Sequence, residues 1–190
     1  LDLSTNKLGN DDSILQETTL QPLSKLKSLQ LQHNKFMTTI PPNLLSIFPA
    51  LEVLDISGNA FKGSLSSPSS STGVAPPLQY LDMSTNLGMA GALPDLTSFA
   101  PTLQTLRLER VAFTYDNFVE TVIPQLTSLT DLRLRENGLT GRVPLDDIFH
   151  KLSNLRYLYI VRNELTGQFP SLQEGAGDEV MSPVLTSAPI

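Results

Sequence analysis

The feature that most constrains this chain is a leucine pattern that returns at nearly constant intervals. The pattern LxxLxLxxNxL fits LKSLQLQHNKF (26–36), LEVLDISGNAF (51–61), LTDLRLRENGL (129–139) and LRYLYIVRNEL (155–165). It is partial in LDLSTNKL (1–8), LQYLDMSTN (78–86) and LQTLRLERVAF (103–113). The leucines that open LxL are separated by 28, 25, 27, 25, 26 and 26 residues. A period of this length predicts a stack of similar units, each called a rung below.

Alternation within LxL predicts one short strand in each rung, because successive side chains of a strand point to opposite faces. Parallel stacking of these strands would bury the leucines in one continuous column. Ahead of the strands, apolar residues recur at every third position, as in Leu45, Phe48 and Leu51. These residues are expected to face the core from the outer, convex side.

Asparagine follows six of the seven predicted strands, at Asn6, Asn34, Asn59, Asn86, Asn137 and Asn163. The backbone bends at this point, and its amide and carbonyl groups lose their strand partners. A buried side-chain amide can satisfy both kinds of group. We therefore interpret these residues as a structural asparagine ladder that joins successive turns.

Two segments depart from the pattern. Val111 replaces the asparagine of the fifth rung, and apolar residues then recur at helical spacing from Phe118 to Ile123. We expect a short helix there, capped by Thr114 or Asp116. Residues 64–77 carry six serines and three prolines, which predicts a solvated loop.

A second signature follows the asparagine, as NGLTGRVP (137–144) and NELTGQFP (163–170), with looser versions at 34–41 and 86–94. Together with the leucine spacing it resembles the leucine-rich-repeat family, and in particular the plant-specific class whose consensus continues NxLxGxIP. The resemblance implies an α/β fold, a curved right-handed solenoid with a parallel sheet on its concave face and short helices and loops on its convex face. We expect the solenoid over residues 1–170, as about seven repeats of which the first is incomplete, and an extension or cap over 171–190.

Composition argues against several functions. The chain has 13 basic and 19 acidic residues, a balance unsuited to gripping nucleic-acid phosphates. No apolar run approaches the ~18 residues of a membrane-spanning helix, so no direct membrane insertion is expected. The chain lacks cysteine, and neither His33 nor His150 has metal-ligand spacing around it. We therefore expect no catalytic residues, no metal and no cofactor.

The compartment is left open by the sequence. The family resemblance favours a secreted or lumenal protein. The absence of cysteine and of any N-x-Ser/Thr sequon argues against a typical extracellular ectodomain.

The charge of the predicted concave face changes sign along the chain. The residue inside LxL is, in order, Asp2, Gln30, Asp55, Asp82, Arg107, Arg133 and Tyr159. Arginine and tyrosine are the residue types that most often anchor protein interfaces. We therefore predict a partner-binding patch composed of Arg107, Arg110, Arg133, Arg135, Tyr157, Tyr159 and Arg162. The alternative is a solvated face, on which Glu109, Asp131 and Glu136 neutralise the arginines in cross-strand pairs.

Several functions fit this pattern. The first is a non-catalytic module that binds a protein or peptide with an acidic or aromatic patch through its concave face. The second is a subunit of a larger assembly that docks through a solenoid end or the convex face, because Leu1 and Leu3 belong to a rung with nothing before it. A third, implied by the resemblance, is an inhibitor of cell-wall-degrading enzymes. Ice binding ranks last, because Thr5 and Thr85 recur too sparsely.

Overall fold

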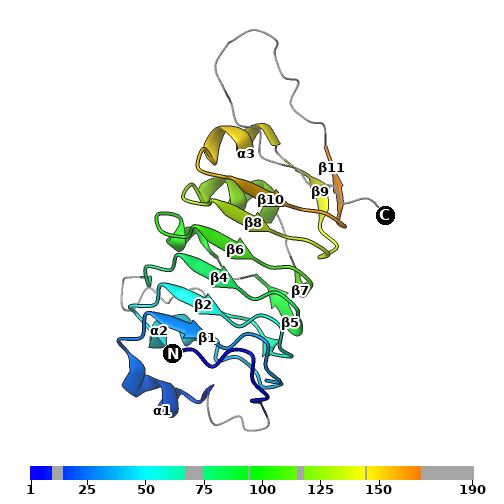
Figure 1. Cartoon of the computed structure of the whole chain (residues 1–190). Helices are drawn as coiled ribbons and strands as arrows, with labels where there is room; N and C mark the ends of the chain where they lie inside the picture. Colours follow the sequence, from blue (N-terminus) through cyan, green and yellow to red (C-terminus); the bar gives the residue numbers. More distant parts are fainter. Residues whose placement is uncertain (10–14, 67–74, 94, 115–117, 144, 168–190) are drawn as a thin grey trace.

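The computed structural model of the chain describes residues 1–9, 15–66, 75–93, 95–114, 118–143 and 145–167. Its main element is a six-stranded parallel sheet, drawn as a stack in Figure 1. The strands, in spatial order, are β1 (Ser28–Gln30), β2 (Val53–Asp55), β4 (Tyr80–Asp82), β6 (Thr105–Arg107), β8 (Asp131–Arg133) and β10 (Tyr157–Tyr159). Asp2 extends the sheet through an isolated bridge to Gln30. The prediction of an α/β solenoid whose LxL segments form one parallel sheet is confirmed.

The register of the sheet places leucine beside leucine in every pair of neighbouring strands. The aligned residues are Leu29, Leu54, Leu81, Leu106, Leu132 and Leu158, each at most 2% exposed. The residues two positions later, such as Leu31 and Leu108, are also buried. The intervening side chains lie on the opposite face, for which we keep the name concave face. Burial of the leucines fixes this register, because a slip by one residue would turn every leucine towards solvent.

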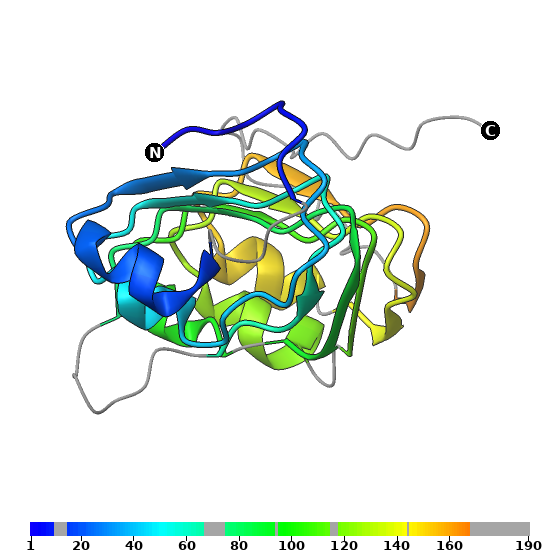
Figure 2. The same cartoon turned by 90° about the horizontal axis from the view of Figure 1, so that it is seen from below.

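A second layer of strands follows the turn after the sheet. It contains β3 (Lys62–Gly63), β5 (Asn86–Ala92) and β7 (Val111–Thr114) in one sheet, and β9 (Thr140–Arg142) and β11 (Glu164–Thr166) in another. Figure 2 shows these strands as a side wall between the main sheet and the convex side. Three of these strands, β5, β9 and β11, lie within the glycine–proline signature, which the sequence analysis did not assign to paired strands. Parallel pairing satisfies their backbone groups.

Short helical segments cover the convex side. They are α1 (Glu17–Leu20), η2 (Gln21–Leu23), α2 (Leu44–Ile47), η3 (Thr97–Phe99), η4 (Phe118–Val122), η5 (Ile123–Gln125) and α3 (Leu145–Lys151). Figure 2 shows the later segments on the side opposite the six-stranded sheet. Side chains such as Phe48, Phe99 and Ile148, each at most 1% exposed, fill the space between the two layers. One continuous core therefore runs along the stack.

The fifth rung contains the expected helical segment, as a single π-helical turn (η4) followed by a 3₁₀ turn (η5). Thr114 does not cap it, because this residue lies in β7 and its hydroxyl donates to the Gly91 carbonyl at 3.1 Å. Asp116 lies outside the described residues, as do most of the serine-rich segment and the whole of 171–190. The expected domain limit near residue 170 therefore stays a prediction.

The asparagine side chains bridge successive turns. Asn59 is representative: its Nδ2 donates to the carbonyl of Leu31 in the preceding turn at 2.9 Å and to that of Ile56 in its own turn at 3.1 Å. Its Oδ1 accepts the Phe36 N–H at 3.2 Å. Equivalent bridges to the preceding turn are made by Asn34, Asn86, Asn137 and Asn163. Asn6 bonds within its own turn, and the apolar Val111 side chain makes no such bridge.

The residue before each of these turn positions has left-handed backbone geometry. In six of the rungs it is not glycine, and φ lies between +54° and +58° at Thr5, His33, Thr85, Arg110, Glu136 and Arg162. In the third rung it is Gly58, at φ +63°. The sharp bend presents these side chains in a row along the end of the sheet.

Candidate functional site

The sheet register brings the predicted patch residues together. Asp82, Arg107, Arg133 and Tyr159 occupy the same position in four successive strands, β4 to β10. The neighbouring column contains Tyr80, Thr105, Asp131 and Tyr157. Arg110, Arg135 and Arg162 follow the strand ends. The patch forms two clusters, each built around one carboxylate.

The inner cluster consists of Tyr80, Arg107, Asp131, Arg133 and Tyr159. Arg107 Nη2 donates to Asp131 Oδ2 at 2.8 Å, and Arg133 Nε donates to Asp131 Oδ1 at 3.0 Å. The Asp131 side chain is only 9% exposed, whereas the two arginine side chains are 29% and 33% exposed. A single carboxylate therefore holds two guanidinium groups of like charge side by side.

Two tyrosine rings complete the inner cluster. The Arg107 guanidinium lies 5.4 Å from the Tyr80 ring centroid, and that of Arg133 lies 4.8 Å from the Tyr159 centroid. Both distances lie within the range of cation–π attraction. The Tyr80 hydroxyl also accepts from Arg107 Nη1 at 3.2 Å and donates to Asp82 Oδ2 at 3.4 Å. Burial, reinforced by the charge of Asp82, raises the pKa of Tyr80 to about 12, so this hydroxyl keeps its proton at neutral pH.

The outer cluster consists of Arg110, Arg135, Glu136 and Arg162. Glu136 contacts all three arginines, at 3.4 Å for Arg110, 2.9 Å for Arg135 and 2.7 Å for Arg162. The hydrogen bond from Arg162, together with the charges of Arg135 and Arg162, lowers the pKa of Glu136. The arginine side chains are 55%, 46% and 65% exposed. Three exposed cations share one carboxylate, which leaves an excess of positive charge at this end of the strands.

The patch residues differ in how many contacts they make with one another. Tyr157 belongs to neither cluster and is 49% exposed. Glu109 lies between the clusters, and burial raises the pKa of its carboxyl group against the opposing charges of Arg133 and Arg135. Both interpretations made from the sequence thus have a physical basis: cross-strand ion pairs are present, and so is exposed positive charge. The sequence analysis did not include Tyr80 in the patch, although its place in the same column as Thr105 and Asp131 was the available signal.

The rungs before the patch are organised differently. Asp55 Oδ1 accepts both the N–H and the hydroxyl of Ser57, at 3.0 and 2.7 Å. Asp82 Oδ1 accepts the Ser84 N–H at 2.9 Å. Burial nevertheless raises the pKa of Asp82, because it outweighs the hydrogen bonds from Ser84. Asp55 and Asp82 are register partners on neighbouring strands, and the charge of Asp55 also contributes to the raised pKa of Asp82.

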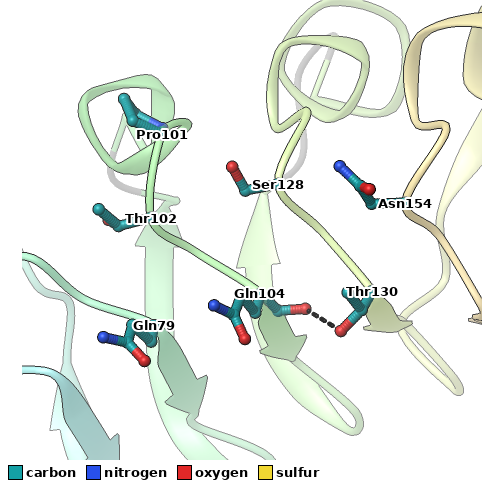
Figure 3. A pocket seen from close by; sticks show the side chains of 7 residues that line it. All are labelled: Gln79, Pro101, Thr102, Gln104, Ser128, Thr130 and Asn154. Atoms are coloured by element: carbon teal, nitrogen blue, oxygen red, sulfur yellow. Dashed lines mark hydrogen bonds between the residues drawn. The ribbon is translucent and has the colours of Figure 1, made fainter.

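A cavity of about 400 Å³ lies at the N-terminal ends of the strands of the main sheet, opposite the end that carries the outer cluster. Figure 3 shows its side chains, which come from four successive turns: Gln79, Pro101, Thr102, Gln104, Ser128, Thr130 and Asn154. None of them was singled out from the sequence.

In the part of the chain that the structure describes, no group of three or more histidine, aspartate or glutamate residues is arranged to hold a metal ion. No described helix has the length and apolar character needed to cross a bilayer.

Sequence comparisons place the chain among repeat proteins. Two family models described as "Leucine Rich Repeat" match residues 25–47 and 103–125. The chain is 33% identical over 123 residues to receptor-like protein 39 of Arabidopsis thaliana. The match covers 65% of this chain and 13% of that protein.

Several solved structures of plant receptor ectodomains are similar to this chain. The complex of PEPR1 with AtPEP1 has a TM-score of 0.64 at 28% identity and matches 80% of this chain. The ectodomain of the Arabidopsis receptor kinase HAESA, in complex with an extended IDA peptide hormone, has a TM-score of 0.62 at 26% identity and matches 89%. The plant peptide hormone receptor RGFR1 in complex with RGF2 has a TM-score of 0.57 at 26% identity and matches 80%. The chain spans 20%, 30% and 27% of the lengths of these three chains.

Proposed function

Because the chain is a leucine-rich-repeat protein of the plant type, we propose that it is a non-catalytic recognition module that binds a protein or peptide through its concave face. The proposed contact residues are those predicted from the sequence: Arg107, Arg110, Arg133, Arg135, Tyr157, Tyr159 and Arg162. The observation that carries the proposal is the outer cluster, where three exposed arginines share one carboxylate. This arrangement favours a ligand that brings its own negative charge.

The two clusters have different roles in the proposal. In the inner cluster, ion pairs and tyrosine rings already hold Arg107 and Arg133, so these side chains form a preorganised floor. In the outer cluster, the arginines keep donors available to an acidic ligand. Tyr157 adds an exposed aromatic surface on the last strand of the main sheet. A segment with acidic and aromatic side chains would complement all three features.

The related structures support this choice of ligand class. HAESA and RGFR1 are both described in complex with peptides, at 26% identity to this chain. This chain corresponds to less than a third of either receptor chain, so the identity of its own ligand remains part of the proposal.

The proposal is tested by selecting ligands from a random peptide library and measuring their affinity for variants. In the variant Arg135→Ala/Arg162→Ala, selected peptides should bind at least tenfold more weakly, because each lost charge-assisted contact contributes more than about 1 kcal/mol. The matched control is Arg142→Ala/Arg156→Ala, which removes two exposed arginines from outside both clusters. Equal affinity of the first variant and the wild type would refute the assignment of these residues. Affinity lost only in the control pair would place the site elsewhere.

A further inference from the structure

We propose that the cavity at the N-terminal ends of β4, β6, β8 and β10 is a second binding site, separate from the concave patch, for a neutral oligosaccharide. Its volume of about 400 Å³ lies within the usual range of small-molecule sites, about 300–1,000 Å³. Figure 3 shows its floor as a series of polar side chains on neighbouring turns. The proposal rests on three features: the chemistry of these side chains, their unused hydrogen-bonding capacity and their spacing.

The first feature is the chemistry of the lining. Six of the seven lining side chains carry an amide or a hydroxyl group, the seventh is Pro101, and none is charged. Amides and hydroxyls can both donate and accept hydrogen bonds. Sugar hydroxyls have the same dual character, and a proline ring offers an apolar surface for the C–H groups of a sugar. A charged ligand would find no counter-ion among these residues.

The second feature is that the backbone at this edge is satisfied while the glutamine amides are not. The carbonyl of Gln79 accepts the N–H groups of Gln104 and Thr105 at 2.8 and 3.0 Å. The carbonyl of Gln104 accepts the Thr130 N–H at 2.8 Å and the Thr130 hydroxyl at 3.0 Å, the bond drawn in Figure 3. Within the described part of the chain, the side-chain amides of Gln79 and Gln104 make no hydrogen bond. These two amides are exposed and free to bind a ligand.

The third feature is the repetition along the stack. Gln79, Gln104 and Thr130 each immediately precede a strand, so they stand in one row with the ~4.8 Å spacing of adjacent strands. At the equivalent positions of the rungs before and after these three, the residue that precedes the strand is charged. Lys27 and Glu52 form an ion pair of 2.7 Å in earlier rungs, and Arg156 precedes the next strand. The uncharged stretch therefore covers three of the four rungs that form the cavity, and a short linear chain of sugar units fits its direction.

The test is a titration of the ¹⁵N-labelled full chain with neutral β-1,4-linked hexamers of glucose, mannose and N-acetylglucosamine. At least one hexamer should shift the side-chain NH₂ signals of Gln79, Gln104 and Asn154 in the NMR spectrum. A hexamer of galacturonic acid, which carries charge, should shift them less. The variant Gln104→Ala should weaken the binding about fivefold, as expected for the loss of one hydrogen-bonding side chain.

Matched controls separate this site from the concave patch. Gln30→Ala removes a glutamine from the same sheet but outside the cavity, and should leave sugar binding unchanged. Arg135→Ala/Arg162→Ala should also leave it unchanged, because those residues lie at the opposite end of the strands. The proposal is overturned if no neutral hexamer shifts the three amide signals, or if Gln104→Ala binds as tightly as the wild type. It is equally overturned if the acidic hexamer or an uncharged glycine–serine peptide binds there in preference to the sugars.

Discussion

The acidic rungs of β2 and β4 and the arginine rungs of β6 and β8 share one backbone geometry but stabilise their polar side chains in different ways. Asp55 and Asp82 accept hydrogen bonds from serines two residues later in their own rungs. Arg107 reaches across to Asp131 on the next strand. The difference follows from side-chain length, because an aspartate reaches only its own turn whereas an arginine spans the ~4.8 Å between strands.

This difference has an energetic consequence. Hydrogen bonds within one rung, such as those from Ser57 to Asp55, should contribute to the free energy of unfolding almost independently of distant rungs. Asp82 is in addition linked to Arg107 through the Tyr80 hydroxyl. The inner cluster is a network in which Arg107 and Arg133 depend on the same carboxylate. Removing one member should therefore disturb residues on several strands at once.

The largest expected effect concerns the asparagine ladder, which is present in both the acidic and the arginine regions. Asn86→Ala, in the acidic region, leaves the Phe61 N–H and several carbonyl groups without their side-chain partner, at a cost of about 3 kcal/mol. Asn137→Ala, in the arginine region, should cost about 2 kcal/mol, because Asn137 is less buried. Urea denaturation measures both. The control Asn154→Ala, an exposed position, should change stability by less than about 0.5 kcal/mol. A loss confined to one region would show that the asparagine ladder does not act along the whole stack.

A smaller effect distinguishes the regions directly. Asp131→Ala leaves two half-buried guanidinium groups without their shared carboxylate, and should lower the free energy of unfolding by about 2 kcal/mol. The matched variant Asp55→Ala removes hydrogen bonds to one serine only and should cost about 1 kcal/mol. Urea midpoints of the two variants give the comparison. Equal losses would mean that the cross-strand network contributes no more than the local turns.

The smallest effect is the pH dependence of the outer cluster. The arginines lower the pKa of Glu136 below its ordinary 4.5, so its ionised form stabilises the folded chain above that pH. This stabilisation is lost as the pH falls through the lowered pKa. The melting temperature of Glu136→Gln should therefore lie below that of the wild type at pH 7, and the gap should narrow below pH 4.5. Glu52→Gln, which breaks an exposed pair with a single lysine, should lower the melting temperature less. A pH-independent gap for Glu136→Gln would exclude ionisation as the cause.

Much of the main sheet could be predicted from the sequence, because its register depends on a single requirement. The leucines of LxL must all face the core, and this fixes which residues share a column on the concave face. The second layer of strands could not be predicted in the same way. Segments such as Asn86–Ala92 are rich in glycine and alanine, and their strand character comes from pairing with neighbouring rungs.

The arrangement of the predicted patch residues in columns could be derived from the sequence, but the contacts between their side chains could not. Sequence spacing placed Arg107, Arg133 and Tyr159 in one column, and the structure has them in that column. Which carboxylate joins which arginine depends on side-chain rotamers that reach across strands. The sequence named Asp131 among the carboxylates that could pair with the arginines, but not that Arg107 and Arg133 would share it. The cavity was missed for another reason, since its residues come from the turns before each strand, and amides and hydroxyls there have no distinctive spacing.

The left-handed residue at each turn has a consequence for redesign. Arg110, Glu136 and Arg162 keep side chains in a conformation that glycine adopts without strain, and Gly58 already does so in the third rung. Replacing these three residues with glycine would relieve the left-handed backbone strain of the turns and would remove the charged side chains of the outer cluster at the same time. Backbone strain and surface charge are therefore set by the same three residues.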